Sequence, residues 1–258
     1  LANDTITVSG ALIGSTVEGG QGNDTLANSS TIATSLVQGR KGVDSITVTG
    51  TTTSSTVNGN EDDDTITLTG VVSASKVYGG KAEDTITVGE ASSTLIRGNI
   101  GDDNITVTGT LDKVTVNGNA GTDTIAISSG TVTSSSVYGG AGRDTITHTA
   151  GGDLYVSGDA ANDTITMSGN GDNTVTGGLG QDAITISGTG DNDVSGNGGN
   201  DTITDGAGGG SGSDNTVAGG DGNDTITLDG GGKQSITGGT GADTITAGAG
   251  DDTINGNA

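Results

Sequence analysis

The stretch GGDGNDTIT at residues 219–227 decides the fold, because the same nine-residue unit returns along the whole chain. It reads GGQGNDTLA at 19–27, GGAGRDTIT at 139–147 and GGTGADTIT at 238–246. Position six of the unit is Asp in all thirteen copies, and consecutive copies are 19 to 23 residues apart. Position eight is Ile in twelve copies and Leu26 in the other. A repeat of this length predicts thirteen coils stacked as a solenoid.

Each position-six Asp opens a short stretch such as Asp-Thr-Ile-Thr-Val, whose residues alternate between polar and apolar. Alternation of this kind places Ile6 and Val8 on one face of a strand, and Thr5 and Thr7 on the other. A second apolar residue follows in every coil, as at Val17 and Val37. We therefore expect an all-β, right-handed parallel β-solenoid, forming one continuous domain over residues 1–258.

The composition supports a thin core. The chain has 52 Gly and no Pro, Cys, Trp or Phe, so it lacks the large side chains that fill a thick core. Coils that each bury a few Val, Ile and Leu residues against the next coil need no more than this. The absence of Cys excludes disulfides and thiolate chemistry.

The charge restricts the partners. The formal net charge is −24, which argues against nucleic acid and anionic membrane surfaces and favours cations. No apolar run is long enough to cross a bilayer, so membrane insertion is not expected.

One edge of the coil is expected to build a site. The step from the second apolar residue to the next position-six Asp is seven residues in all twelve copies, whereas the step from that Asp forward to the next second apolar residue ranges from 11 to 16. Loops that only connect elements tolerate changes of length. The invariant edge is therefore the one that holds an ion.

The chemistry of that edge favours a hard cation. Stacking would place the position-six carboxylates about 4.8 Å apart, and such a column of like charges needs neutralising. We expect glycines at positions one and four to adopt positive φ and to turn their carbonyls inward. Carboxylates and carbonyls, without His or Cys, suit Ca²⁺ better than Zn²⁺.

The nine-residue unit resembles the hemolysin-type calcium-binding repeat of RTX proteins, and twelve copies in phase make the resemblance specific. The resemblance implies Ca²⁺ between successive turns, held by position-six carboxylates and by carbonyls of the Gly-rich turn. The carboxylates expected to bind metal are Asp4, Asp24, Asp44, Asp64, Asp84, Asp103, Asp123, Asp144, Asp163, Asp182, Asp201, Asp224, Asp243 and Asp252. The position-one glycines expected to offer carbonyls are Gly19, Gly39, Gly59, Gly79, Gly98, Gly118, Gly139, Gly158, Gly177, Gly196, Gly219 and Gly238.

The second edge departs from the family, in which both edges bind metal. Ser15 and Ser55 stand near the equivalent place in early copies, Asn173 and Asn192 in later ones, and only Asp252 restores the acid. We expect a one-edged column of up to about twelve Ca²⁺, because thirteen loops leave twelve gaps. Twelve divalent ions would also balance the formal charge of −24.

Two further features bear on function. His148 is the only histidine and stands at an inward strand position, so we expect a variant core or edge residue. Acid pairs such as Asp62 and Asp63 have no aromatic-lined pocket around them, so the chain is not expected to be an enzyme. The outward Thr-x-Thr pairs, such as Thr65 and Thr67, resemble the ice-binding face of some antifreeze proteins. The simpler interpretation is β-propensity on a solvated strand.

The ends lie inside the repeat, at LANDTITV and GDDTINGNA, with no obvious cap. The repeat phase would nearly continue from one copy into the next, so we expect head-to-tail self-association on a bacterial cell surface, as a filament, S-layer or adhesin stalk. The alternatives are an ice-binding or glycan-binding module, and the calcium-dependent secretion tail of a larger exoprotein. In each case we expect a secreted protein.

Overall fold

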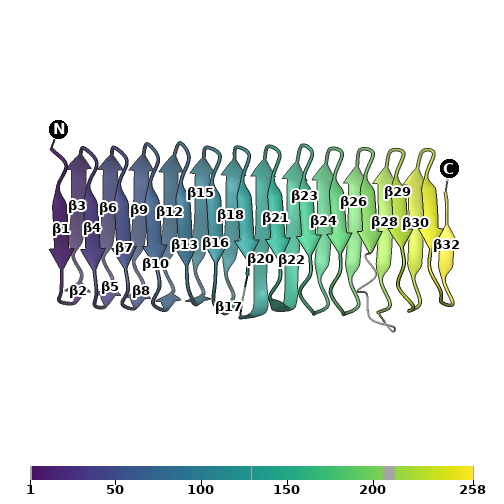
Figure 1. Cartoon of the computed structure of the whole chain (residues 1–258), viewed down its shortest axis with the longest axis horizontal. Helices are drawn as coiled ribbons and strands as arrows, with labels where there is room; N and C mark the ends of the chain where they lie inside the picture. Colours follow the sequence, from purple (N-terminus) through teal and green to yellow (C-terminus); the bar gives the residue numbers. More distant parts are fainter. Residues whose placement is uncertain (1, 129, 206–212, 258) are drawn as a thin grey trace. The chain divides into compact units, whose positions relative to one another are not determined.

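The computed structural model describes residues 2–128, 130–205 and 213–257. Its contacts divide the chain into two compact units, Leu1–Gly130 and Thr131–Ala258. Both units are built from the parallel coils seen in Figure 1. The all-β right-handed parallel solenoid is thus confirmed, while continuity of a single domain across the boundary stays a prediction.

In unit 1, each of the first six coils contributes a four-residue strand to a first sheet and a two-residue and a six-residue strand to a second, and the seventh coil contributes its first-sheet strand. The first-sheet strands are β1 (Thr5–Val8), β4 (Thr25–Asn28), β7 (Ser45–Val48), β10 (Thr65–Leu68), β13 (Thr85–Val88), β16 (Asn104–Val107) and β19 (Thr124–Ile127). The two-residue strands are β2 (Leu12–Ile13), β5 (Ile32–Ala33), β8 (Thr52–Thr53), β11 (Val72–Ser73), β14 (Ala91–Ser92) and β17 (Leu111–Asp112). The six-residue strands are β3 (Thr16–Gln21), β6 (Leu36–Lys41), β9 (Thr56–Glu61), β12 (Lys76–Lys81), β15 (Leu95–Ile100) and β18 (Thr115–Ala120).

In unit 2, most coils contribute one strand to each sheet. The first-sheet strands are β21 (Thr145–His148), β23 (Thr164–Met167), β25 (Ala183–Ile186), β27 (Thr202–Asp205), β29 (Thr225–Leu228) and β31 (Thr244–Ala247). The second-sheet strands are β20 (Thr131–Ala141), β22 (Gly151–Ala160), β24 (Thr174–Leu179), β26 (Asp193–Gly198), β28 (Thr216–Asp221), β30 (Ser235–Thr240) and β32 (Thr253–Asn255). Seven first-sheet strands in unit 1 and six in unit 2 account for the thirteen expected coils.

The register follows the repeat, because equivalent residues of successive coils pair in parallel. Ile66 of β10 lies between Ile46 of β7 and Ile86 of β13, and Ile165 of β23 lies between Ile146 and Ile184. The position-eight side chains therefore stack in a buried ladder. The second apolar residues, such as Val57 and Val77, form another ladder on the opposite sheet. The thin aliphatic core expected from composition is confirmed.

Two polar residues interrupt this core in unit 2. His148 at the end of β21 is fully buried, as the sequence predicts. Asp205 at the end of β27 is also buried, between Ile186 and Leu228 on the ladder, and accepts a hydrogen bond from Asn215 Nδ2 at 3.1 Å. Burial raises the pKa of the Asp205 carboxyl. At Asp205 the interior thus tolerates a polar group, because a neighbouring amide pairs with one of its carboxylate oxygens.

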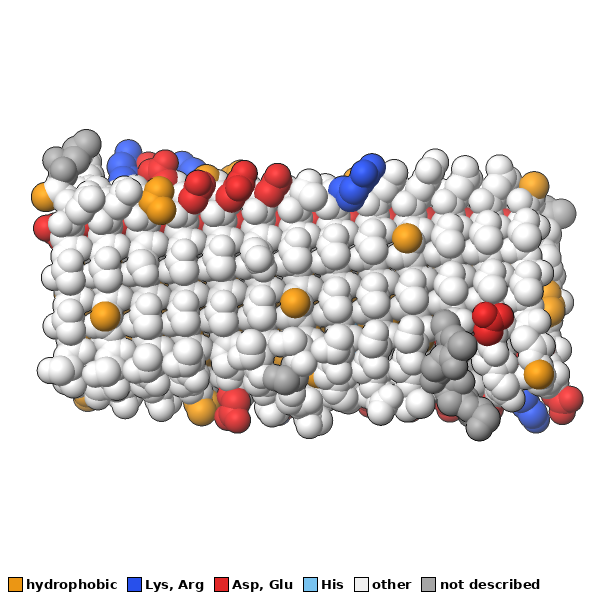
Figure 2. All heavy atoms as spheres, in the orientation of Figure 1, with side chains coloured by type: hydrophobic (Ala, Val, Ile, Leu, Met, Phe, Trp, Pro, Cys, Tyr) orange, Lys and Arg blue, Asp and Glu red, His pale blue; other side chains and the backbone are white. Residues whose placement is uncertain are grey.

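The outward face of the first sheet is uniform. Ten of its fourteen outward positions in unit 1 and eleven of twelve in unit 2 are Thr, and none of these positions is charged among the described strands. Figure 2 shows this face, on which charged side chains lie mainly along the edges. The acidic side chains of this protein therefore lie outside the outward face of the first sheet, mainly along its edges.

Candidate metal centre

The position-six carboxylates form a hydrogen-bonded column in each unit. The backbone N–H of each Asp donates to Oδ1 of the Asp in the next coil, at 2.7–2.8 Å from Asp4 to Asp123 and at 2.8–3.0 Å from Asp144 to Asp243. The column is buried except at Asp4, which is exposed, and Asp243, which is half-buried. The structure therefore brings together the carboxylates that the sequence singled out.

The second oxygen of most carboxylates in the column, Oδ2, is buried, and no hydrogen-bond donor of the described residues reaches it. Oδ2 is buried and has no hydrogen-bond partner within the described part of the chain at Asp24, Asp44, Asp64, Asp84, Asp103, Asp163, Asp182, Asp201, Asp224 and Asp243. A buried charged oxygen without a partner costs several kcal/mol, so such atoms are rare in proteins unless a proton or a cation pairs with them. Ten such atoms in one repeated position point to a ligand that the polypeptide itself does not supply.

The position-one glycines make the space in which these oxygens lie. A Cβ on Gly19 would collide with Oδ2 of Asp24 and would lie 2.8 Å from the carbonyl oxygen of Gly39 in the next coil. The same pair of oxygens surrounds Gly59, where the carbonyl of Gly79 would be 2.6 Å away, and Gly158, where that of Gly177 would be 2.5 Å away. Carboxylate and carbonyl oxygens from successive coils thus converge on one cradle.

Our expectation about glycine conformation is half right. Position four has positive φ in the twelve coils from Gly22 to Gly241, including the non-glycine residues Asp62, Ala82 and Ala161. The prediction is wrong for position one, because none of the glycines there has positive φ. Position one requires Gly for a steric reason. Position two is the second left-handed site, occupied by Gly, Asn, Arg or Asp, as at Arg40 and Asn60. Asn and Asp tolerate that conformation better than most residues.

Burial makes the column reluctant to ionise. Desolvation raises the pKa of Asp64 to about 8, of Asp84, Asp103 and Asp163 to about 7, and of Asp123 and Asp201 to about 6. It also raises the pKa of Asp44, Asp182 and Asp224. In each case the hydrogen bond from the preceding coil's N–H opposes the shift. Near neutral pH the bare column therefore either takes up protons or needs a cation.

A second ladder, at position five, escaped the sequence analysis. Oδ1 of Asn3 accepts a hydrogen bond from the N–H of Asn23 at 2.9 Å, and Oδ1 of Asn200 accepts one from Asn223 at 2.7 Å. Asp63 and Asp102 do the same for the next coils. The signal was present, because seven of the thirteen copies carry Asn or Asp immediately before the position-six Asp. This ladder ties the turns together from the solvent side.

The second edge of unit 1 is closed by serine hydroxyls. Ser35 Oγ accepts from the N–H of Ser15 at 3.0 Å, and its own hydroxyl donates to the carbonyl of Ala33 at 2.7 Å. Ser55 and Ser75 repeat the arrangement. These neutral groups are already satisfied as donors and acceptors, so they do not fit a cation.

The second edge of unit 2 is closed by amides. Asn192 Oδ1 accepts from the N–H and from Nδ2 of Asn173, at 3.1 and 3.0 Å, and Asn215 Oδ1 serves Asn192 in the same way. Gln234 continues the ladder, and Asp252 Oδ1 accepts from the N–H of Gln234 at 3.0 Å. Asp252 therefore lies on the edge opposite to the position-six column.

The donor set of the position-six column suits a hard cation. No group of three or more His, Cys, Asp or Glu side chains placed to hold a metal occurs in residues 2–128, 130–205 and 213–257. A metal here must complete its shell with backbone carbonyls, such as those of the position-one glycines. Ca²⁺ accepts six to eight oxygens of mixed origin in flexible geometry, whereas Zn²⁺ prefers nitrogen and sulfur. The residues present fit Ca²⁺.

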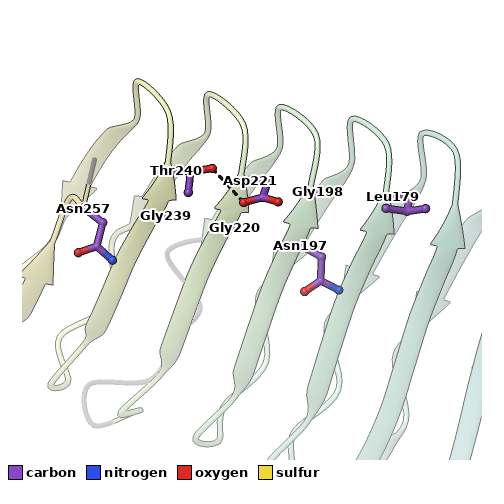
Figure 3. A pocket seen from close by; sticks show the side chains of 8 residues that line it. All are labelled: Leu179, Asn197, Gly198, Gly220, Asp221, Gly239, Thr240 and Asn257. Atoms are coloured by element: carbon purple, nitrogen blue, oxygen red, sulfur yellow. Dashed lines mark hydrogen bonds between the residues drawn. The ribbon is translucent and has the colours of Figure 1, made fainter.

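An open groove of about 630 Å³ lies on the second sheet of unit 2 (Figure 3). Leu179, Asn197, Asp221 and Thr240 line it, and Asp221 Oδ1 accepts a hydrogen bond from the Thr240 hydroxyl at 2.9 Å. The groove offers one carboxylate, whereas acid–base hydrolysis of glycosides requires two. The groove therefore lacks the carboxylate pair of a glycoside hydrolase.

The described residues form no helix with the length and hydropathy of a membrane span. Comparisons with curated proteins and with solved structures gave no significant match.

The family comparison gave a match along the chain. The RTX calcium-binding nonapeptide repeat (4 copies) matches residues 15–27, 47–71, 129–155, 186–208, 209–232 and 228–258, which together make up more than half of the sequence. Repeats of this kind bind calcium, occur typically in secreted proteins and build a structural rather than a catalytic fold. The matched repeats, the parallel coils and the column of partnerless carboxylate oxygens agree with one another, and the chain belongs to the RTX calcium-binding repeat family.

Proposed function

We propose that a column of Ca²⁺ ions along the position-six edge folds this chain into a secreted structural module. The position-six carboxylates and the position-one glycine carbonyls would supply the ligands, for up to about twelve ions, the number of gaps between thirteen coils. The observation that carries the proposal is the repeated meeting of a partnerless Oδ2 with the next coil's glycine carbonyl in one cradle. No catalytic role is proposed.

Calcium would act as a folding switch. Without the ion, carboxylates of neighbouring coils repel one another and resist burial, whereas a bound cation pairs with them and links the coils. A chain exported unfolded would then fold outside the cell, where Ca²⁺ is abundant.

The test is circular dichroism during a Ca²⁺ titration of the metal-free protein. We expect a cooperative gain of β signal with Ca²⁺, and little gain with Mg²⁺ at equal concentration, because Mg²⁺ is smaller and gives up its waters reluctantly. A control with NaCl at matched ionic strength separates ion binding from screening. A protein fully folded in chelator and indifferent to Ca²⁺ would sink the proposal.

We further propose that calcium-loaded copies stack head to tail into a cell-surface filament, S-layer or adhesin stalk. Support comes from the register, because equivalent residues of successive coils pair in parallel, as Ile66 does with Ile46 and Ile86. A coil of a second copy could pair in the same way. Light scattering and electron microscopy of the Ca²⁺-folded chain test this step, and a monodisperse monomer at high concentration would contradict assembly while leaving calcium folding intact.

A second candidate function is ice binding by the first sheet. The observation in its favour is the flat, uncharged face with Thr at most outward positions (Figure 2). Shaping of ice crystals by the Ca²⁺-loaded protein, lost in a Thr67→Lys variant that folds normally, would support it. Unaltered ice growth would remove this candidate.

A further inference from the structure

The cations of this acidic chain gather in one place. The chain has only eight Lys and Arg residues, and four of them, Arg40, Lys41, Lys81 and Arg97, line two adjoining grooves on the second sheet of unit 1. The grooves have volumes of about 280 and 350 Å³, and both include Asn60 and Glu61. The corresponding groove of unit 2, around Asp221, has no cation among its lining residues.

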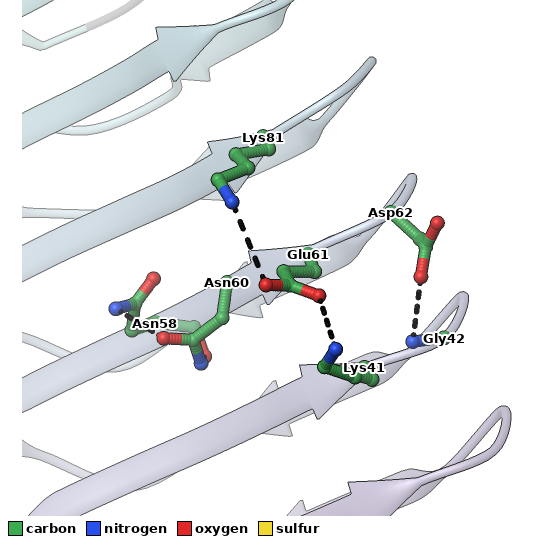
Figure 4. A network of polar contacts seen from close by, with 7 residues as sticks. All are labelled: Lys41, Gly42, Asn58, Asn60, Glu61, Asp62 and Lys81. Atoms are coloured by element: carbon green, nitrogen blue, oxygen red, sulfur yellow. Dashed lines mark hydrogen bonds and ion pairs between the residues drawn. The ribbon is translucent and has the colours of Figure 1, made fainter.

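The cations are only partly neutralised. Glu61 lies between Lys41 and Lys81, with Oε2 at 3.0 Å and Oε1 at 3.5 Å from the two ammonium groups (Figure 4). Lys41 holds the pKa of Glu61 below its ordinary value. Arg40 pairs with Glu18 at 2.6 Å, while Arg97 makes no ion pair among the described residues. The single Glu61 carboxylate thus pairs with both Lys41 and Lys81, and Arg97 has no carboxylate partner among the described residues.

The floor of the grooves is a row of polar, half-buried side chains. Asn58, Tyr78 and Arg97 stand side by side on neighbouring strands, with Gln38 and Asn117 continuing the row on either side. Asn58 Nδ2 donates to Asn60 Oδ1 at 2.8 Å. Planar amides, a guanidinium and one aromatic ring are the groups that hydrogen-bond sugar hydroxyls and stack on sugar rings.

Several polar atoms of this surface are buried without partners. They are Asn58 Oδ1, Arg97 Nε and Asn119 Nδ2, an acceptor and two donors on nearby strands of unit 1. The outward face of the second sheet in unit 2 shows no such atom within its described residues. Each unsatisfied group costs free energy, and a polar ligand would recover that cost where the side chain turns outward to meet it.

We propose that this groove, lined by Arg40, Lys41, Asn58, Tyr78, Lys81 and Arg97, binds a linear acidic polysaccharide. Charge complementarity selects an anionic chain, because the groove is the cationic region of an otherwise acidic protein. Interleaved amides and a tyrosine select sugars over a purely electrostatic partner, and the net charge of −24 disfavours a nucleic acid of dense charge. The anionic group is a carboxylate or a sulfate, both of which accept hydrogen bonds from guanidinium and ammonium.

The test measures binding by isothermal titration calorimetry to the full chain in excess Ca²⁺. The probes are short oligo-uronides that do not gel with Ca²⁺, a sulfated galactan oligomer, neutral dextran and poly-glutamate. Circular dichroism before each titration shows whether the chain is folded, so a failure of calcium folding is seen separately from a failure of this proposal. Preference for the uronide or for the sulfated oligomer identifies the anionic group.

Each groove variant introduces a residue that another coil already carries at the equivalent position. Arg97→Gln introduces the residue found at Gln38, and Lys81→Gln introduces the residue found at Gln21, which stand at equivalent positions of other coils. Each of these two variants should weaken the affinity for the acidic glycan roughly tenfold, because it removes one hydrogen bond from a charged group. Glu61→Gln should tighten binding, since it frees two lysines. The matched controls, Lys113→Gln and Lys233→Gln, remove the same charge outside the groove and should leave the affinity unchanged.

Retained binding in Arg97→Gln and Lys81→Gln, or an equal loss in the two controls, would overturn the assignment of the site. Equal affinity for dextran would overturn the role of charge, and equal affinity for poly-glutamate would overturn the choice of a sugar. Absence of binding to both acidic glycans by the folded protein would overturn the proposal as a whole.

Discussion

At position one, Gly59 has an ordinary φ, yet any side chain there would occupy the space of a carboxylate. A Cβ would collide with Asp64 Oδ2 and approach the Gly79 carbonyl oxygen to 2.6 Å. The residue is therefore required for the cradle rather than for the turn. At positions two and four the reverse holds, since positive φ is imposed but Asn60 and Ala82 are accepted.

Gly59→Ala should destabilise the Ca²⁺-loaded protein by about 1–3 kcal/mol, because the added methyl group overpacks the cradle. It should also lower Ca²⁺ affinity, since Asp64 Oδ2 and the Gly79 carbonyl must move apart. Urea unfolding and calorimetric Ca²⁺ titration measure the two effects. The matched control is Gly10→Ala, whose Cβ meets nothing within 4 Å and should change stability by less than about 1 kcal/mol. Equal behaviour of the two variants would contradict the steric argument.

The metal-free chain should be most stable in acid. Six of the column carboxyls, those of Asp64, Asp84, Asp103, Asp123, Asp163 and Asp201, have folded-state pKa values of about 6 to 8, above the ordinary 3.8. At these positions the folded state therefore holds more protons than the unfolded state. Their contribution is fully present below about pH 4 and is lost as the pH rises towards about 8. Thermal melts of the metal-free protein across this range check the trend, and stability that rises with pH would contradict it. With Ca²⁺ the trend should reverse, because the ion binds ionised carboxylates.

At the scale of the strand, the first sheet separates two roles by alternation. Ile66 faces inward, fully buried between Ile46 and Ile86, while Thr67 faces outward on the uncharged surface. Because each coil rests only on its neighbours, a defect in one rung weakens both adjoining interfaces.

Ile66→Ala should cost about 2–5 kcal/mol through lost burial and the cavity left behind. Thr67→Ala is the matched control, since Ala27 and Ala126 already occupy its position in other coils, and it should be nearly neutral. Urea denaturation in saturating Ca²⁺ compares them. A similar loss in both variants would show that the outward face is as tightly packed as the core.

On the second edge of unit 2, Asn192→Ala should cost about 1–3 kcal/mol, because it leaves donors of Asn173 without their acceptor. The number of bound Ca²⁺ ions should not change, since this ladder contains no position-six carboxylate. Thr185→Ala, an outward change on β25, is the control for stability. Loss of an ion in Asn192→Ala would show that the second edge also binds metal.

At the scale of the whole molecule, periodicity is what made the fold predictable. The position-six Asp and the seven-residue step repeat without exception, and position eight is Ile in every copy but one. Stacking of equivalent residues therefore places them without further information. The reason for Gly19 and its equivalents was not predictable, because it depends on a contact with Asp24 and with the next coil's carbonyl. The chemistry of the second edge was also hidden, because that edge varies in length and uses Ser, Asn and Gln interchangeably as acceptors. The cationic groove was missed for the same reason, since Lys81 and Arg97 occur in single coils and leave no periodic signal.

The most direct test of the central claim is an anomalous difference map from crystals of the Ca²⁺-loaded chain. Our account predicts a row of peaks along the position-six edge, each contacted by a carboxylate oxygen such as Asp64 Oδ2 and by a position-one carbonyl such as that of Gly79, with none along the Ser and Asn ladders. A position-six edge without ions, or ions bound only to the second edge, would contradict it.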